Sequence, residues 1–142
     1  MITNWMDEEW ALVATIDPVD LNGSSATSDA IDMSLYHQIG VWIAAGVLAA
    51  SSTNTFSVTE SATSGGTYTT ITGKTQATVN TDDALQWFIG VKSEELAAGM
   101  RYIKILNAGS AHSQFFCVLV FGQPRFKPGT DNDLASVTTS TH

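Results

Sequence analysis

Short apolar or β-branched runs recur along this chain about every ten residues, and turn-forming residues separate each run from the next. Most runs are too short for an ordinary helix, and several alternate apolar with polar residues, which indicates strands. This spacing predicts an all-β fold, an antiparallel β-sandwich or jelly roll of about 8–9 strands with extended terminal arms. The expected strands cover residues 11–16, 26–33, 38–48, 55–61, 67–73, 76–80, 84–92, 101–107 and 112–121.

The 142 residues are enough for one domain with a single core. The strand pattern assigns residues 11–123 to the sandwich, and the polar, acidic residues 1–10 to an N-terminal arm. Residues 124–142 contain proline and glycine without a strand or helix period, which predicts an extended C-terminal arm. Residues 93–100 fit either one helical turn capped by Ser93 or a plain loop.

The letters Gly-Lys-Thr at residues 73–75 match the end of a nucleotide-binding P-loop. That motif requires glycine at position 68, where this chain has Tyr68, and it opens a helix. Residues 67–72 are mostly β-branched or aromatic, which suits a strand. We therefore expect a β-hairpin in which Gly65 and Gly66 supply the left-handed positions of the turn, and no phosphate site.

The net charge of −8 arises in the first half of the chain. Residues 1–73 hold eight acids and no Lys or Arg, whereas residues 74–142 hold six acids and six bases. Such a surface repels phosphate backbones, so we expect no nucleic-acid binding; it suits a basic protein surface or simply solubility. Arg101 and Lys104 are expected to form ion pairs with the acidic half. No apolar run approaches the ~18 residues of a membrane span, and the acidic start differs from a signal peptide.

Residues that carry catalysis or bind metals form no recognised pattern. The three histidines lack metal-ligand spacing, and no nucleophile elbow is present. Cys117 lies among apolar neighbours, which is typical of a buried thiol in a core strand. We expect no enzymatic activity, no cofactor and no metal site; a calcium-binding turn at residues 130–136 is the remaining alternative.

The faces of the expected strands differ in polarity. One face of residues 84–92 is apolar and predicts a core face formed by Leu85, Trp87, Ile89 and Val91. Residues 112–121 are apolar on both faces, which predicts a central strand buried on both sides or a strand in a subunit interface. Trp42 alternates with small residues, which favours close packing against another sheet or another chain.

A series of short segments follows one order along most of the chain. They read ATIDP, SDAIDM, GVWIAAGVLA, VTES followed by GGTYTTITGK, TDD before an apolar strand, SEEL, RYIKI and PRFKPGTDNDLASV. In these segments, which cover roughly residues 12–137, the chain resembles the capsid decoration or cement proteins of tailed bacteriophages. The resemblance implies a structural protein on the outer surface of the phage head, without an active site. It also implies two partners, the major capsid protein and the chain itself, as a homodimer or homotrimer.

The C-terminal arm carries two apolar residues that a solvated tail does not need, Phe126 and Leu134. An arm that becomes ordered on a neighbouring subunit or on the capsid would explain them, and disorder of both ends is the alternative. The expected partner-binding residues are Trp5, Pro124, Arg125, Phe126, Lys127, Asp131, Asp133 and Leu134.

The alternative function is a non-catalytic carbohydrate-binding β-sandwich module on a phage tail or fibre. Such a module needs an exposed aromatic platform. The candidates are Trp42, Tyr68, Trp87 and Tyr102. Trp87 lies on an apolar alternating face, which favours a core position for this ring.

Overall fold

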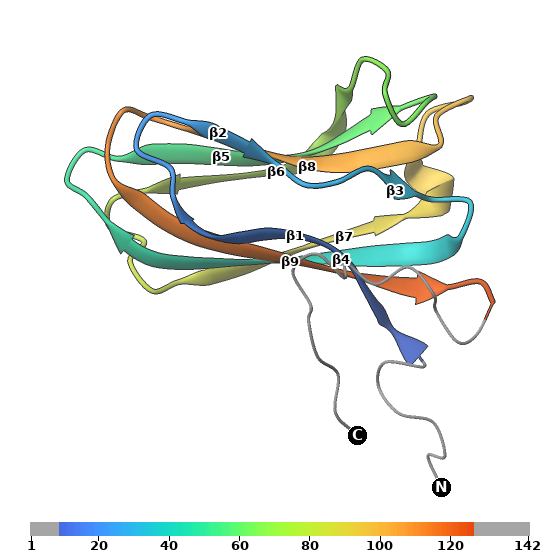
Figure 1. The fold of residues 1–142 in the computed structure, drawn as a ribbon, viewed down its shortest axis with the longest axis horizontal. Coiled ribbons are helices and arrows are strands. Elements are labelled where there is room, and N and C mark those ends of the chain that lie inside the picture. Colours follow the sequence, from blue (N-terminus) through green and yellow to red (C-terminus); the bar gives the residue numbers. More distant parts are fainter. Residues whose placement is uncertain (1–8, 127–142) are drawn as a thin grey trace, which may run out of the picture.

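The computed structural model describes residues 9–126 as two antiparallel sheets packed face to face (Figure 1). Sheet A contains, in spatial order, β1 (Ala11–Asp20), β9 (Gln114–Pro124), β4 (Tyr36–Leu48) and β7 (Gln86–Lys92). Sheet B contains β2 (Ser25–Thr27), β8 (Tyr102–Gly109), β5 (Thr53–Ser61) and β6 (Thr69–Val79), and β3 (Ile31–Asp32) also pairs with β8. The expected all-β sandwich of antiparallel strands is therefore confirmed.

The strands fall close to their expected positions, with two differences in number. The expected strands 67–73 and 76–80 form the single strand β6, which continues through Gly73 in a left-handed conformation at φ 78°. The expected strand 26–33 is divided into β2 and β3. It breaks at Ser28, whose Oγ accepts a hydrogen bond from the backbone N–H of Ile105 at 3.0 Å and competes with regular pairing.

The predicted hairpin of residues 55–73 is present as β5 and β6, but its turn differs from the expectation. Neither Gly65 nor Gly66 has a positive φ. Gly66 is needed for close approach instead, because a Cβ there would lie 2.5 Å from Ser61 Oγ and 2.7 Å from Thr63 Oγ1. The expectation that these glycines supply left-handed turn positions was wrong.

The core lies between the inner faces of the two sheets. Its largest fully buried side chains include Ile39, Val41 and Ile43 of β4, Phe116, Val118 and Val120 of β9, and Phe56, Val58, Ile103 and Ile105 of sheet B. The rings of Phe56 and Phe116 meet edge to face across the sheets at a centroid distance of 4.9 Å. This contact links β5, an inner strand of sheet B, to β9, an inner strand of sheet A.

The expected core face of residues 84–92 is confirmed except at its start. Val91 is buried, and Trp87 and Ile89 are half-buried and packed against the core. Leu85 precedes β7 and is 48% exposed, so its assignment to the core was wrong. The strand is at the edge of sheet A, which leaves its early residues with fewer neighbours.

A short 3-10 helix, η1 (Ser93–Glu95), follows β7. The residue at its N-cap is Lys92 and not Ser93, so the expected cap was one residue out of place. The Glu95 carboxylate accepts a hydrogen bond from the backbone N–H of Lys92 at 2.7 Å, which holds the turn closed.

The last strand extends beyond the expected end of the sandwich. Pro124 is buried and pairs with Tyr36, and the backbone N–H of Arg125 donates to the carbonyl oxygen of Leu35 at 2.8 Å. The first residue of the expected C-terminal arm, Pro124, is therefore part of sheet A, and Arg125 is hydrogen-bonded just beyond the end of the strand.

Candidate interaction surfaces

The outer face of sheet A is apolar over its central region. The pairing register brings outward-facing residues into rows across the four strands. One row reads Thr15, Leu119, Trp42 and Phe88, and the next reads Leu12, Phe121, Gly40 and Gly90. We call the apolar face the set Leu12, Trp42, Ala44, Phe88, Phe115, Cys117, Leu119 and Phe121. None of these residues or their neighbours in the two rows is charged, although the chain as a whole has a net charge of −8.

The most exposed part of the apolar face is aromatic. Phe88 is 66% exposed, Phe115 48% and Trp42 47%. The Trp42 indole N–H donates to the side-chain oxygen of Gln86 at 2.8 Å, which fixes the orientation of the ring. A shallow depression of about 200 Å³ lies between Trp42, Gln86, Trp87 and Phe88. Ordered aromatic side chains on a rigid sheet are typical anchors of protein interfaces.

β9 is central, as the sequence predicted, but only one of its faces is in the core. Phe116 and Val118 point inward, whereas Phe115, Cys117 and Leu119 point to the outer side of sheet A. A strand that is apolar on both faces and covered on only one is the arrangement expected of a strand in an interface.

Cys117 is half-buried on the apolar face, so its expected position in the core was wrong. Burial, assisted by the negative charge of Asp17, raises the pKa of the thiol above its ordinary value. A raised pKa lowers the thiolate fraction at neutral pH, so Cys117 lacks the activation of a nucleophile.

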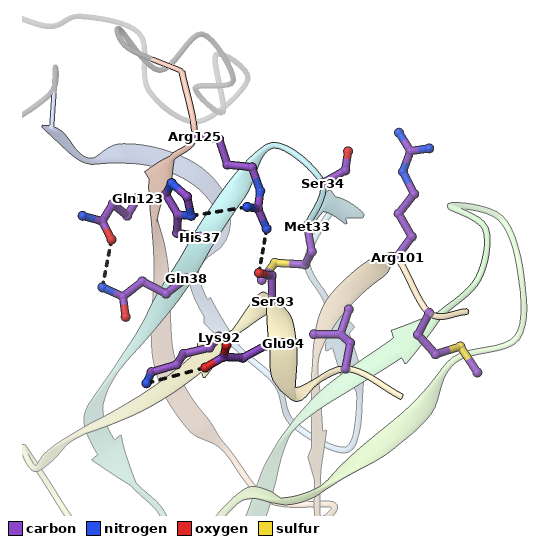
Figure 2. Close-up of a pocket in the computed structure, with 12 residues that line it drawn as sticks. Met33, Ser34, His37, Gln38, Lys92, Ser93, Glu94, Arg101, Gln123 and Arg125 are labelled. Carbon is purple, nitrogen blue, oxygen red and sulfur yellow. Dashed lines mark hydrogen bonds and ion pairs between the residues drawn. The ribbon is translucent and has the colours of Figure 1, made fainter. Parts of the chain in front are cut away.

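A cleft of about 830 Å³ lies at the end of the sandwich where β4 begins and where β7 and β9 end (Figure 2). Its lining includes His37, Lys92, Ser93, Glu94, Arg101 and Arg125. Gln38 and Gln123, which are opposite each other on β4 and β9, form a hydrogen bond of 3.0 Å at the cleft. Met33, Leu96 and Met100 add an apolar part to the wall.

Two side chains hold Arg125 in this cleft, a serine hydroxyl and a histidine ring. Its Nη2 donates to Ser93 Oγ at 2.7 Å, and its Nη1 lies 3.3 Å from His37 Nδ1 (Figure 2). A guanidinium only donates, so His37 Nδ1 is the acceptor in this contact. Arg125 thus keeps its full charge without a carboxylate partner among residues 9–126.

The sequence predicted that Arg101 would pair with an acid of the first half of the chain, and this acid is Asp32. Its Nε and Nη2 donate to the two carboxylate oxygens of Asp32 at 2.8 and 2.6 Å. The hydrogen bonds from Arg101 are the main reason that the pKa of Asp32 falls from 3.8 to about 2. Lys104 has no such pair in the described part of the chain; its Nζ lies 4.9 Å from the centroid of the Tyr68 ring.

The expected partner-binding residues separate into two groups. Arg125 lines the cleft, Phe126 is 81% exposed, and Pro124 is buried at the end of β9. The others, Trp5, Lys127, Asp131, Asp133 and Leu134, lie outside the described residues, as do most of both expected arms and the acidic turn at 130–136.

Of the four aromatic platform candidates, Trp42 is the exposed one. Trp87 packs against the core, as expected, and Tyr68 and Tyr102 are half-buried. Phe88 was not among the candidates predicted from the sequence. Its position identifies it, because Phe88 is a large aromatic residue on the strand face that it shares with Gln86 and Gly90.

The Gly-Lys-Thr letters lie inside β6 and form no phosphate-binding turn. The Nζ of Lys74 donates to the carbonyl oxygen of Gly90 at 2.7 Å and pairs with Glu95 at 3.0 Å. Within residues 9–126, no three His, Cys, Asp or Glu side chains come together as metal ligands, and no helix has the length and apolar character needed to cross a membrane.

No protein-family model matches this chain, and no curated protein sequence is significantly similar to it. The apolar face and the cleft are the two surfaces of residues 9–126 that point to a function.

Proposed function

We propose that this chain is a structural protein of the virion of a tailed phage, which binds the outside of the capsid shell and stabilises it. The observation that supports this proposal most directly is the apolar face. An exposed, contiguous apolar surface on a folded domain marks an interaction site, and the core of a protein interface is depleted in charge and enriched in aromatic residues. Trp42, Phe88 and Phe115 have this character.

The position of the apolar face favours a rigid contact. β9, which supplies four of its side chains, is hydrogen-bonded to β1 on one side and to β4 on the other. Side chains held on a paired strand lose little conformational freedom on binding, so their burial contributes more of its free energy to affinity. A scaffold of this kind is suited to holding neighbouring shell subunits in place.

Weak individual contacts are sufficient for this role. A capsid presents many equivalent sites, and binding of an oligomer at several sites raises the overall affinity by avidity. In this proposal the major capsid protein and a second copy of the chain are the partners, and both contacts draw on the apolar face or on the terminal arms.

The test is binding to undecorated heads of a tailed phage, measured by co-sedimentation of the wild-type protein and of Phe88→Lys. The substitution places a charge at the most exposed point of the apolar face and is expected to weaken head binding at least tenfold, because burial of an unpaired charge is costly. Thr72→Lys, at an exposed position of β6 in the other sheet, is the matched control and should bind normally. Equal binding by Phe88→Lys and wild type would remove the apolar face from the proposal.

The alternative, a carbohydrate-binding module, keeps one specific observation in its favour. The exposed Trp42 ring, the Gln86 amide and the depression beside them combine a flat aromatic surface with a hydrogen-bonding group. A glycan-binding screen of the wild type and of Trp42→Ala distinguishes the two functions. Saturable sugar binding that Trp42→Ala abolishes would favour the module.

A further inference from the structure

The cleft concentrates positive charge on a chain that is otherwise acidic. Residues 9–126 contain ten acids: Glu9, Asp17, Asp20, Asp29, Asp32, Glu60, Asp82, Asp83, Glu94 and Glu95. They contain five bases: Lys74, Lys92, Arg101, Lys104 and Arg125. Three of these five, Lys92, Arg101 and Arg125, line the same cleft. A cluster of the scarcer charge at a concave site is a feature that a ligand of opposite charge would use.

The three cations differ in how far their charge is already neutralised. Arg101 is fully engaged by the two oxygens of Asp32. Lys92 is 3.9 Å from Glu94, and both side chains are largely exposed, so this pair is weak and easily exchanged. Within residues 9–126, the Arg125 side chain has only the Ser93 hydroxyl and the His37 ring as partners. Arg125 and Lys92 are therefore available to an incoming anion.

The rest of the cleft is suited to a peptide. The Gln38–Gln123 pair offers amide groups between the two available cations, and such groups can bind a peptide backbone (Figure 2). Met33, Leu96 and Met100 form an apolar wall that fits an aliphatic side chain. A peptide in which an acidic residue is followed closely by an aliphatic residue would match these cations, amides and methionines.

We infer that the cleft binds an acidic peptide segment. Arg125 and Lys92 bind its carboxylates, and a neighbouring aliphatic side chain packs against the apolar wall of Met33, Leu96 and Met100. Arg125 is expected to contribute most, because a guanidinium can bind a carboxylate with two parallel hydrogen bonds. This site is at the end of the sandwich and does not depend on the function proposed for the apolar face.

A segment of this chemistry follows Arg125 in the chain. Asp131, Asn132, Asp133 and Leu134 combine two carboxylates with an aliphatic residue. Asp131 is six residues beyond Arg125, and an extended chain of six residues spans at most about 20 Å, so the segment can reach the cleft of its own molecule or of an adjacent copy. The two possible sources, the same molecule and an adjacent copy, present the same acidic segment to the cleft. The experiment below distinguishes them.

The experiment measures binding of a labelled peptide of residues 129–136, GTDNDLAS, to the full-length protein by fluorescence anisotropy. The control peptide, GTNNNLAS, lacks both carboxylates. The protein variants are Arg125→Gln, the matched charge control Lys104→Gln in the other sheet, and the double variant Asp131→Asn/Asp133→Asn, which removes the internal competitor. Circular dichroism and thermal melting check that each variant is folded.

Binding of the acidic peptide, but not of the control peptide, to wild type or to Asp131→Asn/Asp133→Asn supports the inference. Arg125→Gln should weaken this binding about tenfold, and Lys104→Gln should leave it unchanged. Higher salt should weaken it as well. Binding only to the double variant identifies the chain's own segment as the occupant. A fall in the light-scattering mass of the double variant relative to wild type then assigns that segment to a neighbouring copy, and an unchanged mass assigns it to the same molecule.

Two results would overturn the inference. One is the absence of acidic-peptide binding to both wild type and Asp131→Asn/Asp133→Asn. The other is binding that Arg125→Gln and Lys104→Gln affect equally, since this would show a general charge effect and no specific cleft.

Discussion

The ring of Phe88 on β7 lies directly over Gly40 on β4. A Cβ atom at Gly40 would lie 2.6 Å from Phe88 Cε2 and closer still to Cζ. The ring fills the space that two opposite glycines, Gly40 and Gly90, leave on the outer side of sheet A. This contact makes Gly40 buried while Phe88 remains 66% exposed, and it gives the apolar face its shape.

Gly40→Ala should therefore alter the apolar face without unfolding the protein. The added methyl group must displace the Phe88 ring, which can rotate into solvent, so we expect a loss of less than about 1 kcal/mol in unfolding free energy. Head binding, measured by co-sedimentation, should fall severalfold because an interface anchor has moved. Gly90→Ala is the matched control, since its Cβ would lie 3.8 Å from Phe88 Cε1, at an ordinary contact distance. Equal head binding by both variants would show that the ring position is unimportant.

Gly122→Ala should affect stability much more strongly. Gly122 is buried in β9 against the ring of the buried Tyr36, and a Cβ there would lie 2.6 Å from Tyr36 Cδ1. Because this ring is enclosed by the core, overpacking should lower the unfolding free energy by about 1–3 kcal/mol, measured by urea denaturation. At Gly65, a Cβ meets no atom within 4 Å, so Gly65→Ala should have little effect and serves as the control. A stable Gly122→Ala protein would mean that the end of sheet A adjusts easily.

The Asp32–Arg101 pair should make stability depend on pH in the acid range. The pKa of Asp32 is lowered from 3.8 to about 2 in the folded protein. The resulting stabilisation is fully present above pH 3.8 and is lost as the pH falls towards 2, because the unfolded state takes up the proton first. Asp32→Asn should be about 1 kcal/mol less stable than wild type at pH 7, and the two proteins should converge near pH 2.

A double-mutant cycle checks that this effect belongs to the pair. Arg101→Gln should produce a similar loss at pH 7, and the double variant should lose little more than either single variant. Additive losses would show that Asp32 acts through other contacts, such as its hydrogen bond from the backbone N–H of Ser34 at 3.0 Å.

Removal of residues 127–142 tests the role of the C-terminal arm without damage to the sandwich. The cut must fall after Phe126, since Pro124 is buried in β9 and the Arg125 N–H bonds to Leu35. We expect a folded protein, with an unfolding free energy within about 0.5 kcal/mol of wild type, that no longer stabilises phage heads. Sedimentation with heads and thermal melting measure the two properties. Head binding as strong as that of wild type would exclude the arm as a capsid contact.

The sequence by itself determined the class of fold and most of the strand positions, because these depend on local patterns. Period-two alternation in residues 101–107 puts Ile103 and Ile105 on the face opposite Tyr102 and Lys104, and both isoleucines are buried in the core. The sequence also identified β9 as central, and it predicted that Arg101 would pair with the acidic half.

Only the tertiary structure decided which apolar face of β9 remains exposed and which residues share a site. Cys117 and Val118 have similar neighbours in sequence, but one points outward and the other into the core, since the pairing register fixes the direction of every side chain in a strand. The formation of the cleft also depends on how the strands pair. His37, Ser93 and Arg125 are far apart in the chain and meet because antiparallel pairing brings the start of β4 beside the ends of β7 and β9.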